Sequence, residues 1–360
     1  MNAPFADPVD LDLPEPWRQT AAAALAATGV VMVMGGSDSG KSTFCRYLLG
    51  EARRRRRPWA FLDADLGQSH VGPPATIGLK LYPGAAPDDW GLRADACYFI
   101  GQTSPPGRLL EIVVGLKRLV DKARPRRQLI IVNTSGFISG PAALRLKTAK
   151  AEVLRPRLGI ILVRHEEMAA LLPPLTLLCQ ETQLLPVSPQ ARQKSWEERR
   201  RHRQERFAAF FAKATPQPFP LDRNTWLDFP FAQGRQLTPA ELAGLQDLAE
   251  TTIWHAERGG GCVYLVTAGL LPEAAQSRLA AHLSPERLVW APWSQLAFRL
   301  VGLLDKNMYT LSMGILLEAD WQGKAITLLT PLAAQRLPEV RFLRLGKLRL
   351  DPSGQELPPS

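Results

Sequence analysis

Short apolar runs alternate with amphipathic stretches over residues 16–214 of this chain. The apolar runs, which we interpret as buried strands, lie at 30–34, 59–65, 97–101, 128–132, 158–163 and 183–187. Helical patterns lie at 16–27, 41–56, 109–122, 141–153, 166–172 and 195–214, and a loop is expected over 73–89. Strands that alternate with helices are typical of a parallel sheet covered by helices on both faces. The pattern therefore predicts an α/β fold with a doubly wound parallel sheet.

The pattern changes after residue 215. Proline is frequent in 216–230, which predicts a linker or domain edge. From 259 to 352 the apolar runs are short and are separated by Gly, Pro and Asp, as in a small β domain. We expect a lead-in at 1–27, an α/β domain at 28–215 and a smaller, mainly β C-terminal domain at 216–360. The glycine cluster at 259–261 has no strand-to-helix setting, so it predicts a turn or hinge.

The stretch from 35 to 43 reads Gly-Gly-Ser-Asp-Ser-Gly-Lys-Ser-Thr and meets the pattern G-x-x-x-x-G-K-[ST] between a predicted strand and a predicted helix. Such a loop turns its backbone N–H groups and a helix N-terminus toward phosphate oxygens. Lys41 is predicted to reach the β- and γ-phosphates, and Ser42 to place its hydroxyl on Mg²⁺. The candidate nucleotide-binding residues are Gly36, Ser37, Asp38, Ser39, Gly40, Lys41, Ser42 and Thr43. The stretch predicts a P-loop nucleotide-binding fold.

Two carboxylates follow the second predicted strand. If this strand neighbours the first, Asp63 and Asp65 arrive beside the phosphates. The strand at 128–132 ends in Asn133, where many nucleotide-hydrolysing proteins have a magnesium-binding Asp, so the acidic role falls to Asp65 or Asp63. Asp65 is a candidate to orient magnesium-bound water or to accept a proton, although it also suits the turn before Gly67.

The charge distribution favours a polyanionic partner. The chain has a net charge of +10, with 46% hydrophobic and 22% charged residues, which is typical of a globular protein rather than a disordered one. Much of the excess lies in two arginine-rich runs, 53–57 and 192–206. Both runs are also compatible with solvated helix faces, and the first suits the negative end of a helix dipole.

Cysteines, histidines and the N-terminus indicate no metal cluster and no export. Cys45, Cys97, Cys179 and Cys262 form no C-x-x-C pair, and His70, His165, His202, His255 and His282 show no ligand spacing. We expect each histidine to be a surface or core residue. The acidic N-terminus is unlike a signal peptide and no apolar run reaches membrane-spanning length, so we expect a cytoplasmic protein without a membrane partner.

Several motifs together resemble the polynucleotide 5′-hydroxyl kinase family, which includes the kinase subunit of eukaryotic mRNA cleavage factor, the nucleolar pre-rRNA-processing kinase and archaeal RNA kinases. The motifs are the loop at 35–43, Leu-Asp-Ala-Asp-Leu-Gly-Gln at 62–68, Phe-Ile-Gly-Gln-Thr-Ser-Pro at 99–105, Asn-Thr-Ser-Gly-Phe at 133–137, the arginine helix at 192–211, Gly-Leu-Leu-Asp at 302–305 and Leu-Thr-Pro at 329–331. The resemblance covers most of residues 28–355.

The resemblance implies that Lys41 and Ser42 serve ATP and Mg²⁺, and that Asp65 is the general base for a 5′-hydroxyl, with Gln68 close by. It implies a clasp on the nucleic-acid end at Thr134, Gly136 and Phe137, and a phosphate-covering lid matched by Arg199, Arg200 or Arg203. The chain departs from the family at Phe137, where tryptophan is frequent, and at Lys194, where arginine is frequent. Only residues 1–28 precede the first strand, so a compact prokaryotic or archaeal-type member is expected.

The favoured function is transfer of the ATP γ-phosphate to the 5′-hydroxyl end of RNA or DNA. One alternative is an ATP-binding scaffold of an RNA-processing complex with little or no kinase activity. Another is a small-molecule kinase or a GTPase, against which stand the basic lid helix and the lack of an N/T-K-x-D motif after 158–163. The preference for RNA or DNA, for single or double strands, and the oligomeric state stay open.

Overall fold

The computed structural model describes residues 13–83, 93–126, 129–164 and 168–358. It divides into two compact units, residues 1–203 and 204–360. The domain boundaries at 27/28 and 215/216 stay predictions.

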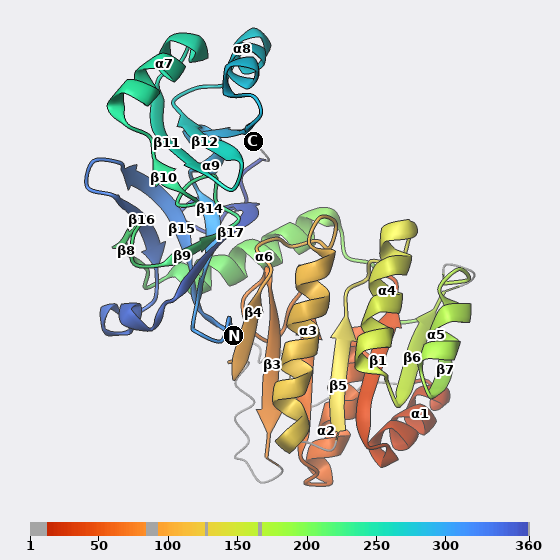
Figure 1. Cartoon of the computed structure of the whole chain (residues 1–360). Helices are drawn as coiled ribbons and strands as arrows, with labels where there is room; N and C mark the ends of the chain where they lie inside the picture. Colours follow the sequence, from red (N-terminus) through yellow and green to blue (C-terminus); the bar gives the residue numbers. More distant parts are fainter. Residues whose placement is uncertain (1–12, 84–92, 127–128, 165–167, 359–360) are drawn as a thin grey trace. The chain divides into compact units, whose positions relative to one another are not determined.

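The first unit is built on a seven-stranded sheet with the strand order β4-β3-β2-β5-β1-β6-β7 (Figure 1). Its strands are β1 (Gly29–Gly35), β2 (Trp59–Ala64), β3 (Thr76–Tyr82), β4 (Ala96–Phe99), β5 (Leu129–Thr134), β6 (Leu158–Val163) and β7 (Glu181–Pro186). The neighbours β2, β5, β1, β6 and β7 are all parallel. Parallel strands are buried on both faces, which explains the continuous apolar runs of β1 and β5. The predicted α/β class with a P-loop-type parallel sheet is confirmed.

Helices cover both faces of this sheet. They are α1 (Glu15–Ala26), α2 (Lys41–Arg54), α3 (Leu109–Ala123), α4 (Pro141–Leu154) and α5 (Leu172–Leu178), with a 3₁₀ turn at Arg124–Arg126. Helix α6 (Trp196–Phe211) begins in this unit. On one face, Trp17 of α1 and Phe44 and Leu48 of α2 share a core with β1, β5 and β6. Helices α3, α4 and α5 pack side by side over the other face (Figure 1). The end of β1 and the start of α2 therefore lie on the side of the sheet where the parallel strands have their carboxyl ends.

Two elements of the first unit differ from the sequence expectation. The predicted loop over 73–89 contains strand β3, which is antiparallel to β2 and β4, so the sheet is not parallel throughout; residues 84–92 lie outside the described ranges. The helix expected at 166–172 is instead α5, which begins at Leu172, and residues 165–167 are likewise outside those ranges. Pro173 and Pro174 fit its first turn, where no N–H is needed for an intrahelical bond.

The second unit contains a six-stranded sheet, β8-β16-β15-β14-β17-β9, and a four-stranded sheet, β10-β11-β12-β13. The strands are β8 (Thr215–Pro220), β9 (Thr225–Leu227), β10 (Arg235–Gln236), β11 (Ile253–Gly259), β12 (Cys262–Thr267), β13 (Arg287–Pro292), β14 (Arg299–Leu304), β15 (Thr310–Asp320), β16 (Ala325–Thr330) and β17 (Phe342–Arg349). Helices α7 (Pro239–Ala249), α8 (Glu273–Leu283) and α9 (Trp293–Leu296) and a 3₁₀ segment at Ala334–Glu339 complete it. The mainly β character is confirmed, and Gly260 and Gly261 form the turn of the β11–β12 hairpin.

The stretch expected as a linker or domain edge at 216–230 contains strands β8 and β9, so it is not an unstructured linker. Strand β8 carries Pro216, Pro218 and Pro220 and lies at the edge of the six-stranded sheet, paired only with β16. Proline is accepted at a sheet edge because the N–H that it lacks faces away from the neighbouring strand. Within the described ranges no helix combines the length and apolar character that a bilayer crossing requires.

Candidate active site

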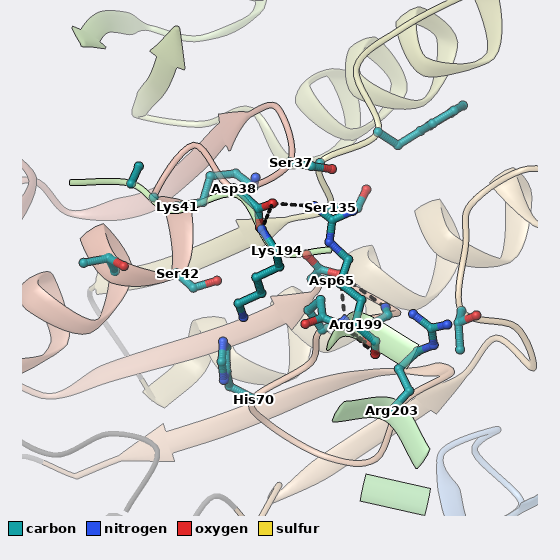
Figure 2. Close-up of a pocket in the computed structure, with 18 of the residues that line it drawn as sticks. Ser37, Asp38, Lys41, Ser42, Asp65, His70, Ser135, Lys194, Arg199 and Arg203 are labelled. Atoms are coloured by element: carbon teal, nitrogen blue, oxygen red, sulfur yellow. Dashed lines mark hydrogen bonds and ion pairs between the residues drawn. The ribbon is translucent and has the colours of Figure 1, made fainter. Parts of the chain in front are cut away.

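A cavity of about 570 Å³ lies in the first unit, at the carboxyl ends of β1, β2 and β5 (Figure 2). Ligands bind at this edge in open α/β sheets because loops and helix N-termini converge there. Its lining includes residues from the phosphate loop and α2, from 65–70, 103–105 and 135–137, and from the segment that leads into α6. The lining residues among the sequence candidates are Ser37, Asp38, Gly40, Lys41, Ser42, Thr43, Asp65, Gln68, Gly136, Phe137, Arg199 and Arg203.

The phosphate loop ends where α2 begins, and Gly40 occupies the N-cap with φ 90°. A Cβ at this position would lie 2.7 Å from the ring of Trp17, so both the backbone conformation and the packing require glycine. Lys41 is buried, and its Nζ donates to the carbonyl oxygen of Gly36 at 2.5 Å. The lysine side chain therefore folds back over the loop, so its ammonium group and the loop amides could bind the same phosphate group. Gly36 and Ser39 lie outside the cavity lining.

The two aspartates take different positions. Asp63 is fully buried, and its carboxylate accepts hydrogen bonds from the backbone N–H of His70 at 2.6 Å and from Nδ2 of Asn133 at 3.0 Å. Burial, and next the charge of Asp65, raises the pKa of Asp63 to about 7. Asp65 lines the cavity, and its Oδ1 accepts from the backbone N–H of Gly67 and Gln68 at 3.2 and 3.0 Å. The turn therefore fixes Asp65 at the cavity, with Asp63 behind it.

Asn133 joins this network to the start of α2. Its Nδ2 lies 3.5 Å from Oγ of Ser42, and its Oδ1 is buried without a hydrogen-bond partner. The strand pairing brings the end of β5 between β1 and β2, so an amide stands between the phosphate loop and the aspartates. Ser42, Asp65 and Asn133 thus supply hard oxygen atoms of the kind that Mg²⁺ prefers.

The segment after β5 packs directly against the phosphate loop. A Cβ built at Gly136 would lie 2.7 Å from the backbone N of Ser37, so glycine alone allows this approach. Ser135, Gly136 and Phe137 line the cavity. Thr134 does not: it is fully buried, and its hydroxyl donates to the carbonyl oxygen of Val33 at 2.9 Å. The predicted clasp residues are therefore adjacent, but only part of the set faces the cavity.

Helix α6 brings the arginine-rich segment to the cavity. Arg199 forms an ion pair with Asp38 of the phosphate loop, and the backbone N–H of Lys194 donates to Asp38 Oδ2 at 3.0 Å (Figure 2). Arg203 also lines the cavity. Arg200 is not a lining residue, and its guanidinium lies 5.4 Å from the ring centre of Trp196. The other arginine run, 53–57, lies at the C-terminal end of α2 and does not line the cavity.

Three residues near the site had no role in the sequence interpretation. His70 lines the cavity (Figure 2). Lys147 and Lys150 of α4 are fully buried, and Lys147 Nζ donates to Thr134 Oγ1 at 2.9 Å and to the carbonyl oxygen of Ser135 at 2.6 Å. No local signal marks these lysines, because a lysine in an amphipathic helix is normally exposed.

A smaller cavity of about 270 Å³ adjoins the main one, and the two share Gln68, Arg192 and Lys194. Glu198 and His202 complete its lining. Arg192 forms an ion pair with Glu198. The basic groups therefore continue beyond the main cavity along the start of α6.

Comparison with known proteins identifies relatives along most of the chain. The family model described as the mRNA cleavage and polyadenylation factor CLP1 P-loop matches residues 35–213. The polyribonucleotide 5′-hydroxyl-kinase of Pyrococcus furiosus is 31% identical over 329 residues, covering 91% of this chain and 89% of the relative. That of Methanocaldococcus jannaschii is 28% identical over 329 residues, covering 91% and 88%.

Solved structures agree in fold. The structure of wild-type Clp1p in complex with Pcf11p matches with a TM-score of 0.57 and 13% identity, covering 92% of this chain and 78% of that one. A second structure, of an extended interface between Pcf11p and Clp1p, matches with a TM-score of 0.59 and 13% identity, covering 92% and 79%. At this identity the likeness concerns the fold alone.

Proposed function

This chain belongs to the polyribonucleotide 5′-hydroxyl-kinase family with the CLP1 P-loop, and from that premise we propose that it transfers the γ-phosphate of ATP to the 5′-hydroxyl end of a polynucleotide. The observation that carries the proposal is that one cavity brings together Lys41, Asp65 and Arg199 from three separate segments of the chain. A phosphoryl transfer needs these three roles: a phosphate cradle, a group that takes the proton, and positive charge near the transferred group.

The phosphate loop is proposed to hold the triphosphate. Residues 36–43 supply backbone amides and the N-terminus of α2, and Lys41 exchanges its bond with the Gly36 carbonyl for the β- and γ-phosphate oxygens. The lysine needs only a local movement because it already lies against the loop. Asp38 stands at the same loop and orients Arg199 toward it.

The oxygen donors beside the loop fit a magnesium ion. Ser42 and Asp65 are proposed to hold it, and the unpartnered Oδ1 of Asn133 is suited to a water molecule of its shell. When bound, Mg²⁺ would neutralise charge on the phosphate oxygens. Asp63 is bonded to His70 and Asn133 and holds the surroundings of Asp65 in place.

Asp65 is proposed as the general base. It takes the proton of the 5′-hydroxyl as the 5′ oxygen forms a bond to the γ-phosphorus and the bond between that phosphorus and the β–γ bridging oxygen breaks, leaving ADP. Two backbone N–H groups fix Oδ1, so the orientation of the carboxylate is set before the substrate arrives. Arg199 and Arg203 are proposed to stabilise charge on the transferred group.

The polynucleotide end is proposed to lie between Gln68 and the segment Thr134–Phe137, with Phe137 offering a ring for stacking on the terminal base. The adjoining cavity with Arg192 and Lys194 suits the phosphates that follow. Arg200 is proposed to bind the polynucleotide together with Arg192 and Lys194, because its guanidinium lies over the ring of Trp196 at the same end of α6. A cytoplasmic location stays a prediction.

The test is transfer of labelled γ-phosphate from ATP to matched 5′-hydroxyl RNA and DNA oligonucleotides, with 5′-phosphorylated oligonucleotides as controls. We expect transfer to RNA, lost in Lys41→Ala and Asp65→Asn proteins that still fold. Comparison of the two polymers gives the sugar preference. ATP binding without transfer to either polymer would refute the kinase and favour an ATP-binding scaffold.

A further inference from the structure

Lys147 connects α4 to the segment that follows β5. Its Nζ donates to Thr134 Oγ1 and to the carbonyl oxygen of Ser135, at 2.9 and 2.6 Å. The side chain is fully buried although it carries an amine. A buried lysine is costly unless its donors are used, so these two bonds account for its place in the core.

The contacts continue from Lys147 to the phosphate loop by two routes. The Thr134 hydroxyl accepts from Lys147 and donates to the carbonyl oxygen of Val33, in the strand that leads into the loop. Ser135 precedes Gly136, whose Cα packs so closely on Ser37 that no side chain fits between them. Displacement of the Ser135 carbonyl would therefore move the segment that lines the cavity at 135–137.

Lys150 provides an internal comparison. It lies one turn further along α4 and is equally buried, yet its Nζ has no hydrogen-bond partner. Within the described ranges neither lysine forms an ion pair with a carboxylate. The two residues share residue type and burial, but only Lys147 is hydrogen-bonded to the segment at the cavity.

We propose that Lys147 is a positioning residue of the kinase, whose amine holds Thr134 and Ser135 so that the segment 134–137 meets the 5′ end of the polynucleotide. This inference rests on the proposed function. It explains a buried amine that the phosphate cradle, the base and the lid arginines do not require. Since Lys147 does not reach the cavity, it acts through the backbone of the segment and not on the substrate.

The experiment compares Lys147→Met with Lys150→Met, two substitutions of equal size and burial. In Lys147→Met we expect kcat/KM for the polynucleotide to fall by about 10- to 100-fold, as for a small misplacement of a substrate-binding segment. The KM for ATP should change by less than about threefold, because the phosphate loop lies between β1 and α2 and Lys147 forms no hydrogen bond to it. Lys150→Met should keep the activity of the unaltered protein.

A measurement that does not depend on kinase activity separates this inference from the kinase proposal. Hydrogen exchange of the backbone amides at 135–138 should accelerate in Lys147→Met and not in Lys150→Met. If the unaltered chain transfers no phosphate, the proposed function fails. Unchanged hydrogen exchange in Lys147→Met would by itself refute the positioning role of Lys147. Equal losses in both variants, in step with their melting temperatures, would reduce Lys147 to a packing residue.

Thr134 gives a second route should Lys147→Met not fold. Thr134→Val keeps the shape and removes the hydroxyl, whereas Thr134→Ser keeps the hydroxyl. We expect Thr134→Val to lose polynucleotide kcat/KM and Thr134→Ser to retain most of it. Equal activity of these two variants would contradict the relay through Thr134.

Discussion

Asp38, in the phosphate loop, and Arg199, in α6, form an ion pair although 161 positions separate them in the chain. The N–H of Lys194 also donates to Asp38, so a single carboxylate holds the start of the arginine segment against the loop. An incoming triphosphate brings negative charge to the same place and competes for Arg199. In the proposed function, this ion pair holds Arg199 against the phosphate loop before nucleotide binds.

Asp38→Asn is expected to tighten ATP binding by up to about fivefold, because a partly exposed ion pair contributes at most about 1 kcal/mol. Asparagine is chosen because Asp38 has φ 54°, a conformation that asparagine tolerates better than alanine. ATP affinity by calorimetry checks this. Weaker binding would mean that the carboxylate helps to order the nucleotide site.

Arg199→Ala is expected to lower kcat on the order of 10³-fold, as for an arginine that stabilises transferring phosphoryl oxygens. The KM for the polynucleotide should change little. Steady-state transfer at saturating ATP measures the effect. Arg55→Ala, at the far end of α2, removes the same charge away from the cavity and should leave kcat unaltered.

Asp65→Asn is expected to lower kcat by about 10²- to 10⁴-fold, because the amide cannot take the proton of the hydroxyl. Its oxygen still accepts from Gly67 and Gln68, so the turn and ATP binding should persist. The exposed Asp121, which pairs with Lys117 on α3, offers the control Asp121→Asn. Retained transfer in Asp65→Asn would exclude this residue as the base.

Gly136→Ala is expected to reduce kcat/KM by about 10²-fold, because its Cβ must displace the backbone of Ser37. The matched control is Gly244→Ala in α7, where a Cβ meets no atom within 4 Å. That change should raise stability by about 0.5–1 kcal/mol and leave transfer unaffected. Thermal melting and transfer assays on both proteins separate the two effects.

Lys150→Met is expected to stabilise the protein below pH 8. Burial lowers the pKa of Lys150 from 10.5 to about 8, and the nearby Asp65 opposes the shift. Between these values the unfolded chain binds a proton that the folded chain lacks, so the cost of the buried amine fades as pH rises from 8 to 10.5. The charge-dependent part of the gain should be up to about 3 kcal/mol below pH 8 and should disappear near pH 10.5. Denaturant titrations at pH 7 and 10 measure the difference, and an equal gain at both would contradict this origin.

The sequence predicts those features whose signals are local. The phosphate loop is recognisable because a strand, a glycine-rich turn and a helix start follow one another within residues 29–54, and all three appear in the structure. Strand β3 was missed because Pro73 and Pro74 mark a turn just before it. Prolines likewise made β8 look like a linker.

The remaining parts of the site depend on tertiary contacts. The distance of Asp65 from the loop depends on which strand neighbours β1, and in the sheet it is β5, not β2, that does so. Asn133, at the end of β5, therefore lies between the phosphate loop and Asp65. The buried Lys147 and Lys150 have the spacing of an ordinary polar helix face, and only the packing of α4 on the sheet reveals that this face is internal.

The prolines of β8 have a consequence for self-association. Pro216, Pro218 and Pro220 occupy alternate positions, so their nitrogen atoms lie on one side of the strand, and the N–H groups that pair with β16 must come from the residues between them. The outer side then offers carbonyl oxygens and no donors. A strand from another molecule cannot form a regular ladder there, and this border is protected against the edge-to-edge growth that leads to fibrils.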